Sequence, residues 1–305
     1  MIRGGAIGDF VLTLPSIKLL RDRFPGGHLE ILGSRHIIAL AENRFYADAT
    51  RSLDSGQLAS FFTSDSVLSV DWISYFASFD LILSFLSDPD GIFRGNLERC
   101  GVRMFIAGSP KLNDSEHAAR QLARPLEQIG LLLQNPAARI YPTEADRAFA
   151  RNLLAGVRGP VIALHPGSGS ETKNWPVENW RILGEHLFST DRPVLAIGGE
   201  ADEERLRLLS VAWKKKPVRF IKNLALPHLG ALLESSVFVG HDSGISHIAA
   251  AVGARAILLF GPTDPAVWAP ANENVTVLRA PDGNLGLLGV DRVLAAVERG
   301  ARGNL

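Results

Sequence analysis

The segment Gly240-His-Asp-Ser-Gly-Ile-Ser-His247 has the residue types of an anion-binding site. An apolar run precedes it, and an alanine-rich stretch typical of a helix follows it. A strand, a turn of small residues and a helix start together expose unpaired amide N–H groups at the positive end of a helix dipole. His247 follows Ser243 and Gly244 by about one helical turn, so its side chain points back toward the same anion. In the alternative interpretation, Asp242 or Ser243 only caps the helix and His247 only packs.

A second segment with suitable chemistry is His165-Pro-Gly-Ser-Gly-Ser-Glu-Thr-Lys-Asn-Trp-Pro176. It follows the apolar run 161–164, which places it at the carboxyl end of a strand, where open α/β sheets bind ligands. Its glycines allow close backbone approach, Ser168 and Thr172 supply hydroxyl donors, and Lys173 supplies a point charge for a phosphate. The alternative is an ordinary flexible loop with a solvated lysine. Two phosphate-suited loops on one sheet favour a binding site.

A third segment, Gly4-Gly-Ala-Ile-Gly8-Asp9, forms a tight turn before a helical stretch. Its spacing, G-G-x-x-G, differs from the dinucleotide pattern G-x-G-x-x-G, so neither a nicotinamide nor a flavin cofactor is expected. Asp9 is either a cap of the following helix or a general base. Only Met1 and Ile2 precede Arg3-Gly4-Gly5, so the first strand is either very short or starts upstream of this sequence.

Other catalytic templates fit poorly. The sequence has no P-loop, no H-E-x-x-H and no G-x-S-x-G pattern. Asp88-Pro-Asp90 has the D-x-D spacing of some metal-dependent sugar transferases, but its proline indicates a turn, and we predict no metal site. The five tryptophans follow neither a helical nor a strand period, so they do not indicate a stacking platform for nucleic acid.

These segments must be positioned by strands and helices, and short apolar runs alternate with amphipathic stretches along most of the chain. Such alternation predicts βαβ units, and hence an α/β fold with parallel sheets and helices on both faces. The predicted strands are 28–32, 79–85, 102–107, 161–165, 194–198, 218–221, 237–240 and 256–260. The predicted helices are 16–24, 115–130, 177–188, 202–212, 227–235 and 245–252. The segment 134–143, with two prolines and little periodicity, is the expected domain boundary.

Composition narrows the class of protein further. The 305 residues suffice for two domains, and 46% hydrophobic residues exclude a disordered or fibrous protein. The 32 Lys and Arg residues balance 32 Asp and Glu residues, so no overall charge recruits nucleic acid or an anionic membrane. A single cysteine, Cys100, rules out an intrachain disulfide and a cysteine-rich zinc site. We see neither a signal peptide nor an apolar run of about 18 residues, so we expect a cytoplasmic protein.

Five motifs in order give the chain a resemblance to glycosyltransferase family 9, the ADP-heptose:lipopolysaccharide heptosyltransferases. The resemblance is dense over 161–265 and thin over 53–150. The motifs are Gly8-Asp9 with Val11-Leu-Thr-Leu-Pro15, His165-Pro-Gly with Lys173-x-Trp-Pro176, Gly198-Gly199 followed by acidic residues, Gly240-x-Asp-Ser-Gly-x-x-His247, and Gly261-Pro-Thr-Asp-Pro265.

The resemblance implies the GT-B architecture, in which two Rossmann-like domains with parallel sheets face each other across a cleft. Residues 1–145 would form the N-terminal domain that binds the acceptor. Residues 146–305 would form the C-terminal domain that binds the nucleotide sugar, with the last helix as a candidate to return to the N-terminal domain.

The resemblance also implies roles for individual residues. Asp9 matches the proposed general base, and Lys173 matches the lysine that neutralises the departing diphosphate, with Ser168 and Thr172 in the same loop. The remaining expectations are that the turn of Asp242, Ser243, Gly244 and His247 holds the diphosphate, that Glu203 contacts the ribose, and that Gly8 and Arg94 bind the acceptor. The reaction would be a single inverting displacement at the anomeric carbon, without metal or cofactor.

The expected partners are an ADP-sugar donor and a glycolipid or glycan acceptor, with a peripheral position at the inner face of the cytoplasmic membrane. Two features depart from this pattern. Ser243 stands where the family usually has threonine. Residues 1–150 carry 15 Lys or Arg against 17 Asp or Glu, whereas a phosphorylated acceptor favours a basic face. Arg94, Arg99 and Arg103 form either a small basic face or ordinary surface positions.

Three alternatives therefore stay open: a family member with a different donor or acceptor, a catalytically silent binding protein with the same fold, and an epimerase of nucleotide sugars.

Overall fold

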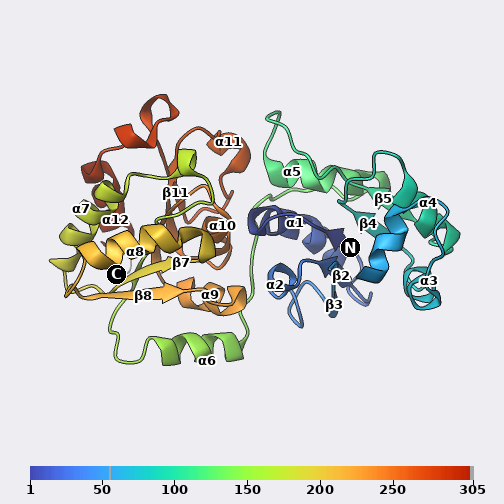
Figure 1. Cartoon of the computed structure of the whole chain (residues 1–305), viewed down its shortest axis with the longest axis horizontal. Coiled ribbons are helices and arrows are strands. Elements are labelled where there is room, and N and C mark those ends of the chain that lie inside the picture. The colour runs from blue at the N-terminus through green and yellow to red at the C-terminus, as the bar shows by residue number, and fades with distance from the viewer. Residues whose placement is uncertain (55, 303–305) are drawn as a thin grey trace. The chain divides into compact units, whose positions relative to one another are not determined.

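The computed structural model describes residues 1–54 and 56–302, which form two compact units. Unit 1 comprises Met1–Asn113 and Ala118–Asn135, and unit 2 comprises Asp114–His117 and Pro136–Leu305. Each unit is built on its own parallel sheet with helices around it (Figure 1). The predicted α/β fold with parallel sheets is thereby confirmed.

Unit 1 has a five-stranded sheet in the order β3-β2-β1-β4-β5. Its strands are β1 (Ile2–Arg3), β2 (Glu30–Gly33), β3 (Ala49–Ser52), β4 (Ile82–Ser84) and β5 (Phe105–Ala107). Its helices are α1 (Ile7–Arg23), α2 (Arg35–Ile38), α3 (Val70–Ala77), α4 (Ile92–Arg99) and α5 (Ala118–Ala123), with 3₁₀ turns η1 (Gly56–Phe62) and η2 (Arg124–Ile129). The strand order reverses between β1 and β4, so the turn from β1 into α1, which carries Asp9 in its first turn, starts at the switch point of this sheet.

Helix α1 is longer than predicted. It begins at Ile7 and continues through Pro15, whereas the sequence predicted a helix over 16–24. A proline inside a helix removes one backbone hydrogen bond. The buried side chains of this helix, including Phe10, Leu14 and Ile17, supply apolar burial that offsets this loss.

Unit 2 has a six-stranded sheet in the order β11-β10-β9-β6-β7-β8. Counted along the chain, this is the 3-2-1-4-5-6 order of a Rossmann fold, with its switch point between β6 and β9. The strands are β6 (Ile162–Leu164), β7 (Val194–Gly198), β8 (Val218–Lys222), β9 (Val237–His241), β10 (Arg255–Phe260) and β11 (Val275–Arg279). The helices are α6 (Glu144–Leu153), α7 (Val177–Phe188), α8 (Glu203–Ala212), α9 (Leu226–Leu233), α10 (Gly244–Ala251), α11 (Pro265–Trp268) and α12 (Val290–Arg302). Short 3₁₀ turns complete the unit: η3 (Glu171–Lys173), η4 (Glu200–Asp202), η5 (Pro281–Gly283) and η6 (Leu285–Leu287).

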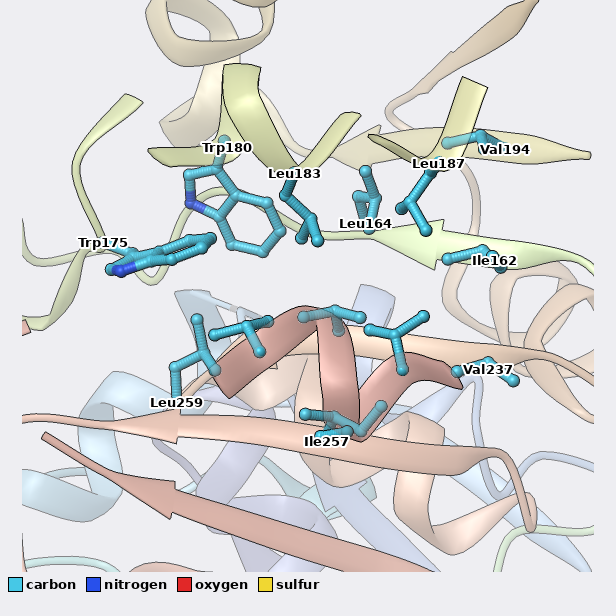
Figure 2. Packing of buried hydrophobic residues seen from close by; sticks show 14 of the residues in the cluster. Ile162, Leu164, Trp175, Trp180, Leu183, Leu187, Val194, Val237, Ile257 and Leu259 are labelled. Carbon is cyan, nitrogen blue, oxygen red and sulfur yellow. The ribbon is translucent and has the colours of Figure 1, made fainter. Parts of the chain in front are cut away.

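The core of unit 2 forms where α7, α8 and α12 cover the sheet. Trp175 and Trp180 are fully buried and meet edge to face, with ring centroids 5.3 Å apart. Figure 2 shows the Trp180 ring between Trp175 and Leu183, with Leu259 of the sheet opposite them. Helix α12 contributes Val293 and other side chains to the same cluster and packs against α7, β9 and β10.

Within residues 1–54 and 56–302, none of the helices is both long and apolar enough to cross a bilayer.

Candidate functional site

The lysine loop, residues 165–176, leaves the carboxyl end of β6 and ends where α7 begins. Its central turn, η3, carries Lys173. The two hydroxyls predicted to bind a diphosphate have partners within the loop: the Oγ of Ser168 donates to the carbonyl of Ser170 at 2.9 Å, and the Oγ1 of Thr172 lies 3.1 Å from the Oγ of Ser170.

The Asp242 turn, residues 240–247, leaves the carboxyl end of β9, the strand that pairs with β6. The ammonium of Lys173 lies 2.6 Å from Oδ2 of Asp242, and the side chains are 31% and 10% exposed, respectively. The hydroxyl of Thr263, in the loop after β10, donates to the same carboxylate oxygen at 2.9 Å. Loops from three neighbouring strands therefore meet at Asp242.

The Asp242 turn also starts helix α10. Ser243 is its N-cap and accepts the N–H of Ser246 at 3.4 Å. The first amides of α10, beginning at Gly244, have no acceptor within the helix, so they supply N–H groups and a positive dipole end beside Asp242. His247 is buried in the first turn of this helix. The structure thus brings together Lys173, Asp242, Ser243, Gly244 and His247 at one edge of the sheet.

Buried polar contacts fix the start of the lysine loop. Nε2 of His165 lies 3.2 Å from Oδ2 of Asp202, which also accepts the N–H of Gly199 at 2.8 Å. Burial alone would raise the pKa of Asp202, but these two hydrogen bonds hold it below its usual value. A Cβ at Gly167 would lie 1.6 Å from Oδ1 of Asp202, so only glycine fits there.

The end of the lysine loop is fixed by Arg205 of α8. Its guanidinium forms an ion pair with Glu171 and donates to the carbonyl of Trp175 at 3.4 Å. Sequence reasoning assigned no role to Asp202, Arg205 or Thr263. Thr263 lies in the motif Gly261-Pro-Thr-Asp-Pro265, and this motif is the feature of the sequence that could have identified it. Glu203, the predicted ribose contact, is exposed at the start of α8, next to Asp202.

In unit 1, Asp9 lies in the first turn of α1. Its Oδ2 accepts the N–H of Ala6 at 2.9 Å, which caps the helix, and its Oδ1 lies 3.5 Å from the guanidinium of Arg3. Arg3 is buried and also donates to the hydroxyl of Thr13 at 3.1 Å. Burial lowers the pKa of Arg3, and the carboxylate of Asp9 partly compensates. Asp9 therefore caps α1, and its side chain remains partly exposed to solvent.

The other acceptor-side candidates are bonded locally. Gly8 is the second residue of α1. Arg94 forms an ion pair with Glu98 at 2.9 Å, and Arg103 forms one with Asp80 at 2.7 Å. These carboxylates offset the positive charge of the arginines.

Asp88, the first carboxylate of the Asp88-Pro-Asp90 motif, is bonded to the backbone of α4. Its two carboxylate oxygens accept the backbone N–H groups of Phe93 and Arg94, at 3.0 and 2.9 Å. It therefore stabilises the start of α4. In the part of the chain that the structure describes, no cluster of three or more His, Cys, Asp or Glu side chains is suited to a metal ion.

The sequence of this chain is similar to those of known proteins from one family. The family model described as glycosyltransferase family 9 (heptosyltransferase) matches residues 111–286, more than half of the chain. The lipopolysaccharide heptosyltransferase 1 of Pseudomonas aeruginosa PAO1 is 32% identical over 294 residues, covering 87% of this chain and 79% of the relative. The enzyme of the same name from Escherichia coli RS218 is 29% identical over 195 residues, covering 62% of this chain and 59% of the relative. The alignment thus spans less than two thirds of that second relative.

Solved structures show the same fold. The glycosyl transferase family 9 structure from Veillonella parvula superposes with a TM-score of 0.82 at 19% identity, covering 98% of this chain and 96% of the other. E. coli heptosyltransferase WaaC with ADP superposes with a TM-score of 0.71 at 18% identity, covering 98% of each chain. The fold of this chain is therefore that of the GT-B glycosyltransferases, as the resemblance implied.

Proposed function

Because this chain belongs to glycosyltransferase family 9, we propose that it moves a heptose or related sugar from an ADP-sugar to a lipopolysaccharide core or similar surface glycan. Its relatives are named as lipopolysaccharide heptosyltransferases, and one structure of the same fold is described with ADP. These names support the donor and acceptor classes of the proposal.

One observation carries the donor half of the proposal. Lys173, from the end of β6, and the start of α10, at the end of β9, converge at the switch point of a Rossmann sheet. A lysine ammonium and the free amides of a helix start are two recurrent ligands of phosphate groups. Ligands of open α/β sheets bind at such switch points. These features support a nucleoside diphosphate as the ligand of this edge.

The proposed reaction is a single displacement that inverts the anomeric centre. An acceptor hydroxyl attacks the anomeric carbon, the bond from that carbon to the diphosphate oxygen breaks, and nucleoside diphosphate leaves with the bonding electron pair. Asp9 accepts the proton of the hydroxyl, and Lys173 with the α10 amides stabilises the charge that develops on the diphosphate. We assign the ribose contact to Glu203 and further acceptor contacts to Gly8 and Arg94.

This assignment of charge stabilisation to a lysine and backbone amides makes the proposed reaction independent of metal. The proposed acceptor is a lipid-linked glycan, so we place the enzyme on the cytoplasmic side of the membrane as a peripheral protein.

The deciding experiment measures binding first and turnover second. Calorimetry with ADP, UDP and GDP should show tightest binding for ADP. Incubation with ADP-heptose and a heptose-free lipopolysaccharide acceptor should release ADP and give a heptosylated product of inverted anomeric configuration. Tight binding of UDP or GDP would reassign the donor. Product formed without acceptor would favour an epimerase, and binding without turnover of any donor would favour a silent binding protein.

A further inference from the structure

His241 is a buried residue that the proposed reaction does not use. It is the last residue of β9 and directly precedes Asp242. Its side chain is fully buried, with 0% of its surface exposed. It belongs to the Asp242 turn, one of the two loops of the donor edge, and its ring faces the backbone of the other, the lysine loop.

Both ring nitrogens of His241 bond to the backbone of the lysine loop. The N–H of Trp175 donates to Nε2 at 2.8 Å, so the ring proton must be on Nδ1. Nδ1 in turn donates to the carbonyl of Gly167 at 3.2 Å. Gly167 and Trp175 lie near the two ends of the loop, and one imidazole therefore fixes both ends.

The surroundings of His241 keep this bonding pattern intact. Burial lowers the pKa of His241 to about 3, although the Gly167 carbonyl favours the charged form. The ring is therefore neutral near pH 7, with one donor and one acceptor. The indole of Trp180 meets the imidazole edge to face, with centroids 5.4 Å apart, and restricts the orientation of its plane.

His241 is close in the chain, directly or through its bonded partner, to both charged residues of the proposed diphosphate site. Lys173 is two residues before Trp175, and Asp242 is one residue after His241. The same imidazole is thus bonded to one loop and covalently joined to the other. Without it, the buried Gly167 carbonyl and Trp175 N–H would lose these hydrogen-bond partners, which is unfavourable for buried backbone groups.

We propose that His241 is a positioning residue that sets the spacing between Lys173 and the start of α10, and thereby the placement of the donor diphosphate. The role rests on the proposed function, because that function makes a diphosphate the shared ligand of these two loops. A histidine that only filled the core would contribute to stability and leave donor placement unchanged.

Two substitutions separate these roles. His241→Phe keeps a ring and removes both hydrogen bonds, whereas His241→Gln offers one donor and one acceptor on a flexible side chain. We expect His241→Phe to lower kcat about 10-fold or more and to weaken ADP binding, on the scale of misplacing an oriented group. His241→Gln should recover most of this loss.

Leu187→Ala is the matched control, because Leu187 is buried in the same core on α7 and belongs to neither loop. It should lower the melting temperature and leave kcat and the Kd for ADP within about twofold. Equal losses in Leu187→Ala and His241→Phe, or a His241→Phe enzyme with wild-type kcat and ADP affinity, would overturn the positioning role.

A measurement on the wild type covers the case in which His241→Phe does not fold. Nitrogen-15 NMR of the imidazoles should find His241 as the neutral Nδ1–H tautomer, both free and with ADP. An Nε2–H tautomer would overturn the inference. Failure of the proposed function has a different signature, because the wild type itself would then neither bind ADP nor transfer sugar.

Discussion

Lys173 and Asp242 form an ion pair at 2.6 Å although 69 positions separate them in the chain. The pair brings one positive and one negative group to the edge where we propose that a diphosphate binds. A diphosphate would have to share or replace Asp242 as the partner of Lys173. The carboxylate thus holds the lysine at the edge where the proposed reaction uses its charge.

The first prediction concerns this lysine. Lys173→Ala should lower turnover by about 10²-fold or more, because a preorganised charge would no longer face the leaving diphosphate. Steady-state kinetics with saturating donor checks the value. Lys216→Ala is the control, since Lys216 is also ion-paired, with Glu185 at 2.5 Å, but belongs to neither loop of the donor edge. Unchanged kcat in folded Lys173→Ala would remove Lys173 from the reaction.

The second prediction separates chemistry from binding. Asp9→Asn keeps the size of the side chain and an oxygen that accepts the Ala6 N–H, yet it accepts no proton at neutral pH. Loss of a general base typically costs about 10²–10⁴-fold in rate. We expect sugar transfer to fall by this factor, while calorimetry finds ADP affinity near that of the wild type.

A matched control exists for the capping role of Asp9. Asp146 also accepts the N–H of its N-cap residue, Thr143, at 2.8 Å in α6. Asp146→Asn should therefore affect stability and leave transfer unchanged. Should Asp9→Asn lose only as much activity as Asp146→Asn, Asp9 is a cap and the base is another residue.

The third prediction concerns metal. Activity should persist in excess EDTA, because the proposed charge stabilisation comes from Lys173 and the α10 amides. Asp90→Asn should likewise retain turnover. Asp88→Ala should destabilise the protein by about 1 kcal/mol, because the two backbone N–H groups at the start of α4 would lose their acceptor. Activity that EDTA abolishes and Mn²⁺ or Mg²⁺ restores would instead assign a metal to Asp88 and Asp90.

The fourth prediction is a pH dependence of stability. The pKa of His241 is about 3 in the folded chain and near 6.5 when unfolded, so acid protonates the unfolded state first. This group should then lower the free energy of unfolding by about 1.4 kcal/mol for each pH unit between about 6.5 and about 3, because only the unfolded state takes up the proton in that range. Above pH 6.5 it adds no pH dependence. The titratable and charged groups that influence the pKa of His241 are His165, Arg205 and Asp202.

Urea unfolding of the wild type and His241→Gln between pH 7.5 and 4.5 isolates this contribution, because the other groups are common to both proteins. The variant should have the shallower dependence on pH. Parallel curves for the two proteins would show that His241 titrates alike in the folded and unfolded states.

The sequence predicted unit 2 better than unit 1 for a physical reason. Central strands of a parallel sheet are buried on both faces and give continuous apolar runs, and Val194–Gly198 was predicted with its observed bounds. The edge strands Ala49–Ser52 and Val275–Arg279 alternate or carry polar residues, and they were missed. The predicted helix over 115–130 is divided, since Pro125 favours the 3₁₀ turn Arg124–Ile129 after Ala118–Ala123.

For the site, strand ends followed by small residues were enough to indicate the two loops of unit 2. The side chains that fix those loops could not be found in this way. The contacts of His241 and Asp202 depend on the register of strands far apart in the sequence and on the exact path of the loop. No local pattern encodes the contact between a buried histidine and the backbone of a segment 66 positions away.

The pairing of β6 with β9 has a consequence for the order of folding. The lysine loop is synthesised long before the Asp242 turn, and closing so long a stretch of chain costs entropy before any contact forms. During synthesis, a nascent chain that ends before β9 holds the lysine loop without the Asp242 turn, with which we propose that it binds an anion. Nucleotide affinity should therefore emerge only late in refolding, which makes a fluorescent ADP analogue a reporter of the final assembly of this sheet.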